Sequence, residues 1–67
     1  MYVLTLFYRY GSTVKLSNEN DEVLRESAEQ SQRNGLIYAW RIVRREDGKC
    51  ADYWREGEDV NQRLYAI

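Results

Sequence analysis

Hydrophobic residues follow two different patterns along this chain. They are dense over positions 2–10 and 13–16, and again over 36–45 and 50–55, and many of them are β-branched or aromatic, which favours β-strands. Between these two pairs, positions 21–33 carry apolar or small residues at every third or fourth place, which is the period of an α-helix. The pattern therefore predicts the order β-β-α-β-β.

Turn residues join the strands in pairs. Gly11-Ser12, between the first two strands, fits a type II′ turn, which takes Gly at its first central position. In that register Phe7 lies opposite Leu16. Asp47-Gly48, between the last two strands, fits a two-residue type I′ turn, because both of its central residues must tolerate a positive φ. Each pair of strands is therefore predicted to form a hairpin.

The two-residue turn predicts which side chains of the second hairpin share a face. Ile42 pairs with Tyr53, and Trp40 pairs with Arg55. One face then suits a core and carries Tyr38, Trp40, Ile42, Ala51 and Tyr53. The other face carries Ile37, Ala39, Arg41, Val43, Arg45, Cys50, Asp52 and Trp54. We expect the second of these faces to be the open one.

The helical stretch has clear start and stop signals. Positions 17–20 hold several residues that cap a helix N-terminus, and Asp21 and Glu22 follow where the helix dipole favours acids. Asn34-Gly35 is a good C-terminal stop. The positions at helical spacing on the inner side are mostly small: Leu24, Ser27, Ala28 and Ser31. Such a stripe can lie close to a sheet whose own side chains are large.

These elements predict an α+β fold in a single domain spanning residues 1–67. In a four-stranded antiparallel sheet of order 2-1-3-4, one helix packed on one face returns the chain from the second strand to the third. A helix of about 13 residues is ~20 Å long, which matches a strand of about six residues. Residues 58–67 fit either a short C-terminal helix or an additional edge strand.

The 67 residues include one cysteine and no histidine. The lack of histidine excludes Ser-His-Asp and Cys-His catalytic sets and Cys/His zinc sites, and the sequence has no phosphate-binding glycine loop. We therefore expect a protein that is not an enzyme and uses no metal, cofactor or small-molecule substrate. The single Cys50, with no signal peptide and no apolar run of ~20 residues, predicts a cytoplasmic protein without a membrane span.

The face expected to be open keeps apolar residues among its arginines, although the open face of a one-sided sheet should be polar. Arginine and aromatic residues are enriched in binding hot spots. We therefore expect this face to associate with a protein partner or with a second copy of the chain. Its expected centre is Arg41, Val43, Arg45, Asp52 and Trp54. The alternative is that the C-terminal tail covers the face and the aromatic residues only reflect strand propensity.

The net charge is −1, but the charges are unevenly distributed. The helix carries an acidic row, Glu22, Glu26 and Glu29, whereas the second hairpin is mildly basic. With its small size, acidic helix and aromatic sheet, the chain resembles many accessory proteins of phages and mobile elements. Some of those inhibit host nucleoprotein machines by presenting an acidic surface in place of nucleic acid, and the resemblance implies this role for the acidic row. We prefer the simpler interpretation, in which the row is only a solvated helix face.

Aromatic residues interleaved with arginines on a sheet are also typical of platforms for single-stranded nucleic acid. On such platforms bases stack on the rings and basic groups follow the backbone. The sequence has no motif of the known platform folds, and an acidic helix beside the site would repel phosphate. Single-stranded nucleic acid is therefore the second candidate partner.

Overall fold

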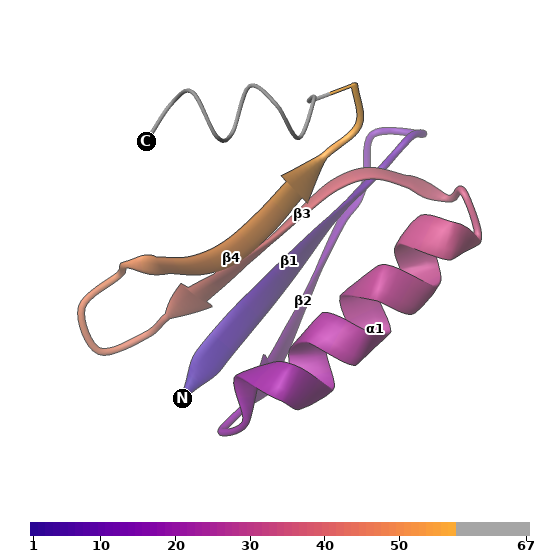
Figure 1. Ribbon diagram of the computed structural model, residues 1–67. Coiled ribbons are helices and arrows are strands. Elements are labelled where there is room, and N and C mark those ends of the chain that lie inside the picture. The colour runs from indigo at the N-terminus through magenta and orange to yellow at the C-terminus, as the bar shows by residue number, and fades with distance from the viewer. Residues whose placement is uncertain (58–67) are drawn as a thin grey trace.

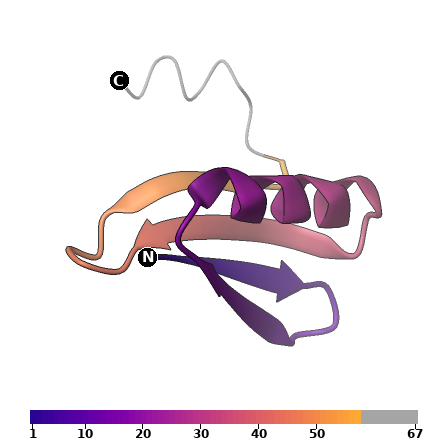
Figure 2. The same ribbon diagram turned by 90° about the horizontal axis from the view of Figure 1, so that it is seen from below.

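The computed structural model describes residues 1–57, and it has the predicted α+β architecture (Figure 1). The elements are β1 (Tyr2–Tyr8), β2 (Thr13–Asn18), α1 (Asp21–Arg33), β3 (Ile37–Arg44) and β4 (Cys50–Arg55). Every strand pair is antiparallel, and the sheet order β2-β1-β3-β4 confirms the prediction. Figure 2 shows α1 lying along one side of the sheet. The expected helix or strand at 58–67 lies outside the described residues.

Helix α1 begins and ends where its capping residues predict. The backbone of Asn20 is extended (φ −104°, ψ 116°), and its side chain accepts a hydrogen bond from the N–H of Glu22 at 2.9 Å. At the other end Gly35 has φ +72°, a conformation that glycine adopts without steric cost. Its N–H donates to the carbonyl of Gln32 at 3.1 Å. Both helix ends therefore depend on local signals.

The core lies between α1 and the sheet. Its buried members are Leu4, Leu6, Leu24, Ala28, Ile37, Trp40 and Ile42. The small Ala28 allows the helix to approach the sheet, and the large Trp40 fills the volume beneath it. The indole Nε1 of Trp40 donates to Oε1 of Gln32 at 3.0 Å, so the polar atom of this buried ring has a partner. Small residues on the helix thus face large residues on the sheet, as the sequence predicted.

The loop of the first hairpin is longer than predicted. The N–H of Tyr8 donates to the carbonyl of Ser12 at 2.9 Å, and the N–H of Gly11 donates to the carbonyl of Tyr8 at 3.1 Å. These bonds enclose three residues, with Gly11 last at φ +96°, which is the usual form of a three-residue hairpin loop. Leu4 therefore lies opposite Leu16, and the predicted pairing of Phe7 with Leu16 is wrong.

The loop of the second hairpin also differs from the prediction. Gly48 has φ +70°, but no non-glycine residue in the described part of the chain has a positive φ, so Asp47-Gly48 is not a type I′ turn. The N–H of Gly48 donates to the carbonyl of Arg44, and the N–H of Arg44 donates to the carbonyl of Lys49, both at 2.8 Å. The bond between Arg44 and Lys49 therefore closes a four-residue loop, 45–48, in place of the predicted two-residue turn.

A bulge beyond this loop changes which side chains share a face. Val43 pairs with Cys50 but Ile42 pairs with Asp52, so Ala51 is an extra residue in β4. Because side chains alternate along a strand, a shift of one residue moves all of them to the other face.

The prediction is wrong for the rest of β4 because of this shift. Trp54 lies opposite the buried Trp40 and packs against the core. Asp52 and Trp54 therefore lie on the helix side of the sheet, whereas Tyr53 and Arg55 lie on the opposite side.

A second bulge lies in β3. Tyr8 pairs with Ile37 whereas Phe7 pairs with Ala39, so Tyr38 is the extra residue. Ile37, which was predicted on the open face, is fully buried, and Tyr38, which was predicted in the core, is 42% exposed. The ring of Tyr38 lies beside that of Phe7, with 6.2 Å between their centroids. The bulge thus adds an aromatic ring to the face of the sheet opposite α1.

Candidate functional site

The face of the sheet opposite α1 is the candidate site, and we call it the open face. Residues that pair directly in an antiparallel sheet point to the same side, so the register identifies its members. They are Val3, Thr5 and Phe7 on β1, Thr13, Lys15 and Ser17 on β2, Ala39, Arg41 and Val43 on β3, and Cys50, Tyr53 and Arg55 on β4. The unpaired Tyr38 of β3 joins them through its ring contact with Phe7.

One row of residues crosses the centre of the open face. Lys15 pairs with Thr5, Thr5 with Arg41, and Arg41 with Tyr53. Thr5 is only 6% exposed between its neighbours, whereas Lys15 and Arg41 are exposed. The row therefore presents two cations and a phenol ring across all four strands.

Aromatic rings lie next to this row. The guanidinium carbon of Arg41 is 5.8 Å from the centroid of the Phe7 ring, within the range of a cation–π contact. Tyr38 contacts the same ring at a tilt of 45°. The open face thus combines flat apolar surfaces with positive charge in one place.

The charges of the open face have a single sign. Its charged residues are Lys15, Arg41 and Arg55, and none of the residues that the structure describes on this face is Asp or Glu. None of the three cations forms an ion pair with a residue in the described range 1–57, so together they create a local positive potential even on a protein whose net charge is −1.

Several acids are held at the ends of the sheet by cations of their own. Glu46 accepts from the N-terminal amine at 2.8 Å, Asp47 pairs with Arg44 at 2.7 Å, and Glu56 forms a two-pronged pair with Arg9. These hydrogen bonds lower the pKa of each of the three carboxyls. At neutral pH the three carboxylates are therefore ionised, and each is paired with a cation of the protein.

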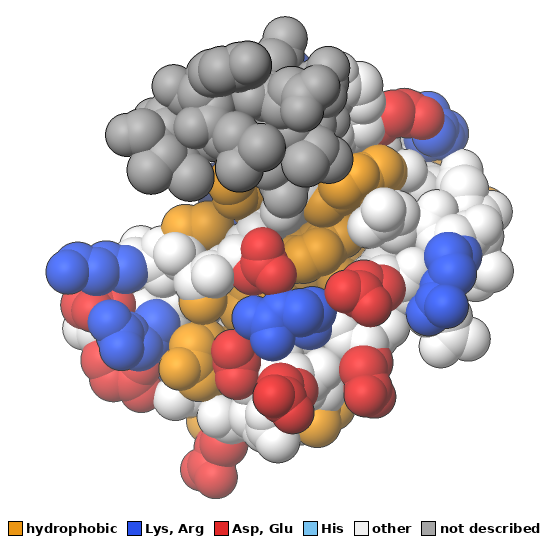
Figure 3. Space-filling view, viewed as in Figure 1, with side chains coloured by type: hydrophobic (Ala, Val, Ile, Leu, Met, Phe, Trp, Pro, Cys, Tyr) orange, Lys and Arg blue, Asp and Glu red, His pale blue; other side chains and the backbone are white. Residues whose placement is uncertain are grey.

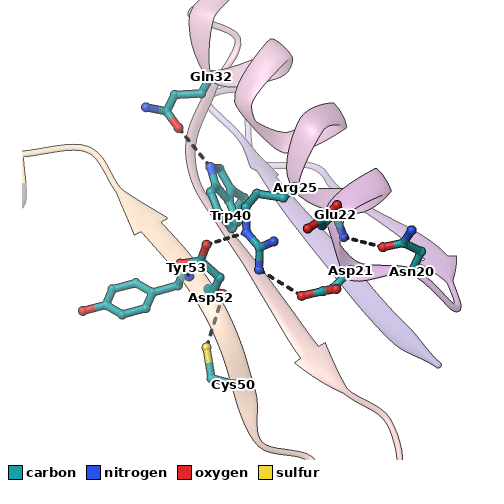
Figure 4. A network of polar contacts seen from close by, with 9 residues as sticks. All are labelled: Asn20, Asp21, Glu22, Arg25, Gln32, Trp40, Cys50, Asp52 and Tyr53. Carbon is teal, nitrogen blue, oxygen red and sulfur yellow. Dashed lines mark hydrogen bonds and ion pairs between the residues drawn. The ribbon is translucent and has the colours of Figure 1, made fainter.

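Asp52 links β4 to the helix (Figure 4). The Nε of Arg25 donates to its Oδ2 at 2.8 Å, and Nη2 of Arg25 donates to Asp21 at 3.1 Å. Both hydrogen bonds raise the pKa of Arg25, and the bond to Asp52 has the larger effect. The second carboxylate oxygen of Asp52 accepts from the N–H of Tyr53 at 2.8 Å. Both carboxylate oxygens of Asp52 therefore accept hydrogen bonds from groups within the protein.

A groove of about 400 Å³ lies on the helix side, between α1 and β4. Its described lining is Glu29, Gln32, Arg33, Trp40, Asp52, Tyr53 and Trp54. Acidic side chains gather on this side of the molecule around a basic patch (Figure 3). The charged residues of the described lining are Glu29, Arg33 and Asp52.

The structure separates the five residues predicted at the centre of an interface. Arg41 and Val43 lie on the open face, as predicted. Arg45 is exposed in the β3–β4 loop, where its N–H donates to the carbonyl of Met1 at 2.9 Å. Asp52 and Trp54 lie on the helix side, so their predicted placement is wrong.

The residues predicted at the centre of the interface included none from β1 or β2. Lys15 and Phe7 join Arg41 only because β1 lies between β2 and β3. The alternation of Val3, Thr5 and Phe7 along β1 was an available signal, since it marks these residues as one face.

The acidic row Glu22, Glu26 and Glu29 is exposed on α1. Leu24 and Ala28 face the sheet, so at about 100° per residue the row lies on the outer side of the helix. None of the three acids forms an ion pair with a residue that the structure describes.

Comparison of this chain with known protein families, curated protein sequences and solved structures finds no match. Within residues 1–57, no group of three or more His, Cys, Asp or Glu side chains is placed to hold a metal ion. The same part of the chain has no helix long and apolar enough to cross a membrane.

Proposed function

We propose that this protein is a non-catalytic binding module whose open face binds single-stranded nucleic acid. The supporting observation is that aromatic rings and cations share this face, with no acid among its described residues. The rings are those of Phe7, Tyr38 and Tyr53, and the cations are Lys15, Arg41 and Arg55. Single strands bind such surfaces because every base can stack on a ring and every phosphate attracts a cation. The second candidate from the sequence thereby becomes the first.

The corrected register of β4 is the reason for this change of order. With Asp52 on the open face, an acid would orient and neutralise Arg41, as in many protein interfaces. Asp52 instead pairs with Arg25 on the helix side, and Arg41 contacts the ring of Phe7. The acidic helix also lies on the other side of the sheet (Figure 2), so it does not border the open face. Both facts favour a polyanion as the partner.

Association with a protein is the second candidate, and different surfaces support it. Val14 and Leu16 on the outer strand β2 are 39% and 41% exposed, although both are apolar. The acidic row on α1 supports inhibition of a nucleoprotein machine by imitation of phosphates, because its carboxylates have no cationic partner among the described residues.

Fluorescence anisotropy with labelled single-stranded DNA and RNA, at several salt concentrations, tests the first proposal. If all three cations neutralise phosphates, log K should fall against log salt with a slope of about −2, because each neutralised phosphate of a single strand contributes about −0.7. Arg41→Glu should weaken binding about tenfold or more. Tyr38→Ala should also weaken it about tenfold, because stacking of one base contributes ~1–3 kcal/mol.

Matched variants elsewhere serve as controls. Arg33→Glu makes the same charge change on α1, and Tyr10→Ala removes a ring that is 74% exposed in the β1–β2 loop. Both should bind within about twofold of the wild type. For Arg33→Glu the reason is that charges about 8 Å apart or more are screened at physiological salt. For Tyr10→Ala the reason is that the ring does not belong to the open face. Absence of nucleic-acid binding by the wild type contradicts the proposal, as does equal weakening by Arg41→Glu and Arg33→Glu.

A further inference from the structure

Among the strands that the structure describes, none pairs with the outer edge of β2. β2 pairs with β1 on one side, without a bulge, and five of its six residues are exposed. Natural sheets usually protect such edges with proline, bulges or charged side chains. β2 has no proline and one charged residue, Lys15, whereas the β4 edge has the Ala51 bulge.

The loop hydrogen bonds determine which backbone groups of β2 point outward. Tyr8 bonds to Ser12, and hydrogen-bonded pairs then alternate along an antiparallel ladder. Val14 and Leu16 therefore direct their backbone groups toward β1. The N–H and C=O groups that point away from the sheet belong to Thr13, Lys15 and Ser17.

The part of the helix nearest β2 is uncharged. Arg25 reaches Asp52 on β4, at the far side of the sheet from β2. Because successive residues lie about 100° apart around a helix and Leu24 faces the sheet, Val23 lies on the opposite flank, toward β2. Ser27 shares that flank, so neither residue brings charge to the edge.

Apolar side chains gather along this edge on the helix side of the sheet. Val14 and Leu16 pair with Leu6 and Leu4, which are buried beneath the helix. Val23 on the neighbouring flank is 45% exposed. The β2 edge thus has outward-pointing backbone groups that no described strand pairs with and, beside them, the partly exposed side chains of Val14, Leu16 and Val23, which we call the apolar border.

We propose that two copies of the chain pair through β2, antiparallel, about a two-fold axis at Leu16. This axis keeps both helices on one side of the joined sheet and both open faces on the other. Leu16 of each copy then meets Leu16 of the second copy. Lys15 lies opposite Ser17 of the second copy, and diagonal to the position of its Glu19, which carries the opposite charge.

Self-complementarity favours a second copy over a foreign strand. Shifting the axis to Lys15 would place two ammonium groups directly opposite each other, which is unfavourable. With the axis at Val14, Ser17 would lie opposite the β1–β2 loop of the second copy, so its outward backbone groups would have no strand to pair with. The axis at Leu16 thus avoids a direct pair of lysines: each Lys15 is diagonal both to Lys15 and to the position of Glu19 in the second copy, and the apolar border of both copies is buried. This inference does not depend on the proposed function.

Disulfide trapping tests the register. In a Cys50→Ser background, Leu16→Cys places one thiol at the axis, in a pair without mutual hydrogen bonds, where Cα atoms lie about 4.5 Å apart and a disulfide can form. We expect a covalent dimer on mild oxidation of Leu16→Cys and little from Val14→Cys or Lys15→Cys. Preferential trapping at Val14 or Lys15 overturns the proposed register, and trapping at none of the three overturns the pairing.

Sedimentation velocity over a wide concentration range tests the pairing itself. The wild type should show a concentration-dependent dimer, and Leu16→Lys should be monomeric with an unchanged circular dichroism spectrum. Leu36→Lys is the matched control, because Leu36 is 53% exposed in the turn before β3, away from the β2 edge. A wild type that is monomeric at every concentration overturns the proposal, as does equal loss of the dimer in both lysine variants.

Discussion

Single side chains decide which face of β4 meets the helix. Arg25 bridges Asp21 on its own helix and Asp52 on β4, and Trp54 packs against the core from the same strand. Exposed ion pairs contribute little on their own, so the burial of Trp54 is the larger stabilising effect and the ion pairs supply orientation. The ring of Trp54 therefore belongs to the core side of the sheet and not to the open face.

Trp54→Ala should lower the free energy of unfolding by about 2 kcal/mol, which is less than a fully buried aromatic residue loses because Trp54 is half-buried. Affinity for single-stranded nucleic acid should change by less than about twofold, since the ring lies on the helix side. Urea unfolding and anisotropy measure the two effects. Unchanged stability combined with lost binding would show that the ring lies on the binding face.

At the scale of elements, the sequence predicted α1 and the strand order because their signals are local. Asn20 caps the helix and Gly35 ends it with bonds to residues nearby in sequence. The register between paired strands is harder to predict than the strands themselves. Asp47-Gly48 suits a two-residue or a four-residue loop, because Gly48 takes a positive φ in either.

The candidate site was predicted only in part for the same reason. Arg41 lies where the sequence placed it, because its strand pairs with its neighbours regardless of the loop length. The position of Trp54 depended on the Ala51 bulge. Bulges are set by how β4 packs against the helix and β3, and the pattern along one strand contains no record of that packing.

The outer face of α1 provides a test of the acidic row. Glu22 and Glu26 are spaced i,i+4, where like charges destabilise a helix slightly. Glu26→Lys should therefore raise the free energy of unfolding by a few tenths of a kcal/mol and leave open-face binding within about twofold. Thermal unfolding and anisotropy measure both, with Glu26→Gln as the variant that removes charge without reversing it. Salt-sensitive loss of a protein partner in Glu26→Lys would instead support imitation of phosphates.

At the scale of the whole molecule, the sheet separates two surfaces of opposite character. The acidic helix and the Arg25 network lie on one side, and the open face lies on the other. The β2 edge borders both, because Lys15 belongs to the open face while Leu16 points to the helix side. Pairing through β2 would therefore join two open faces into one surface without bringing either acidic helix to it.

Binding to strands of different lengths should reveal this joined surface. Small single-strand-binding domains cover ~4–16 nucleotides, so a strand about twice that length can engage both copies at once. The wild type should bind the long strand about a hundredfold more tightly than the short one, because the second contact becomes intramolecular. Leu16→Lys should keep the short-strand affinity and lose most of this gain, whereas Leu36→Lys should keep both. Because the short strand tests the open face alone and the gain with length tests the pairing, each can fail without the other. An equal gain in Leu16→Lys would mean that the copies bind the strand independently.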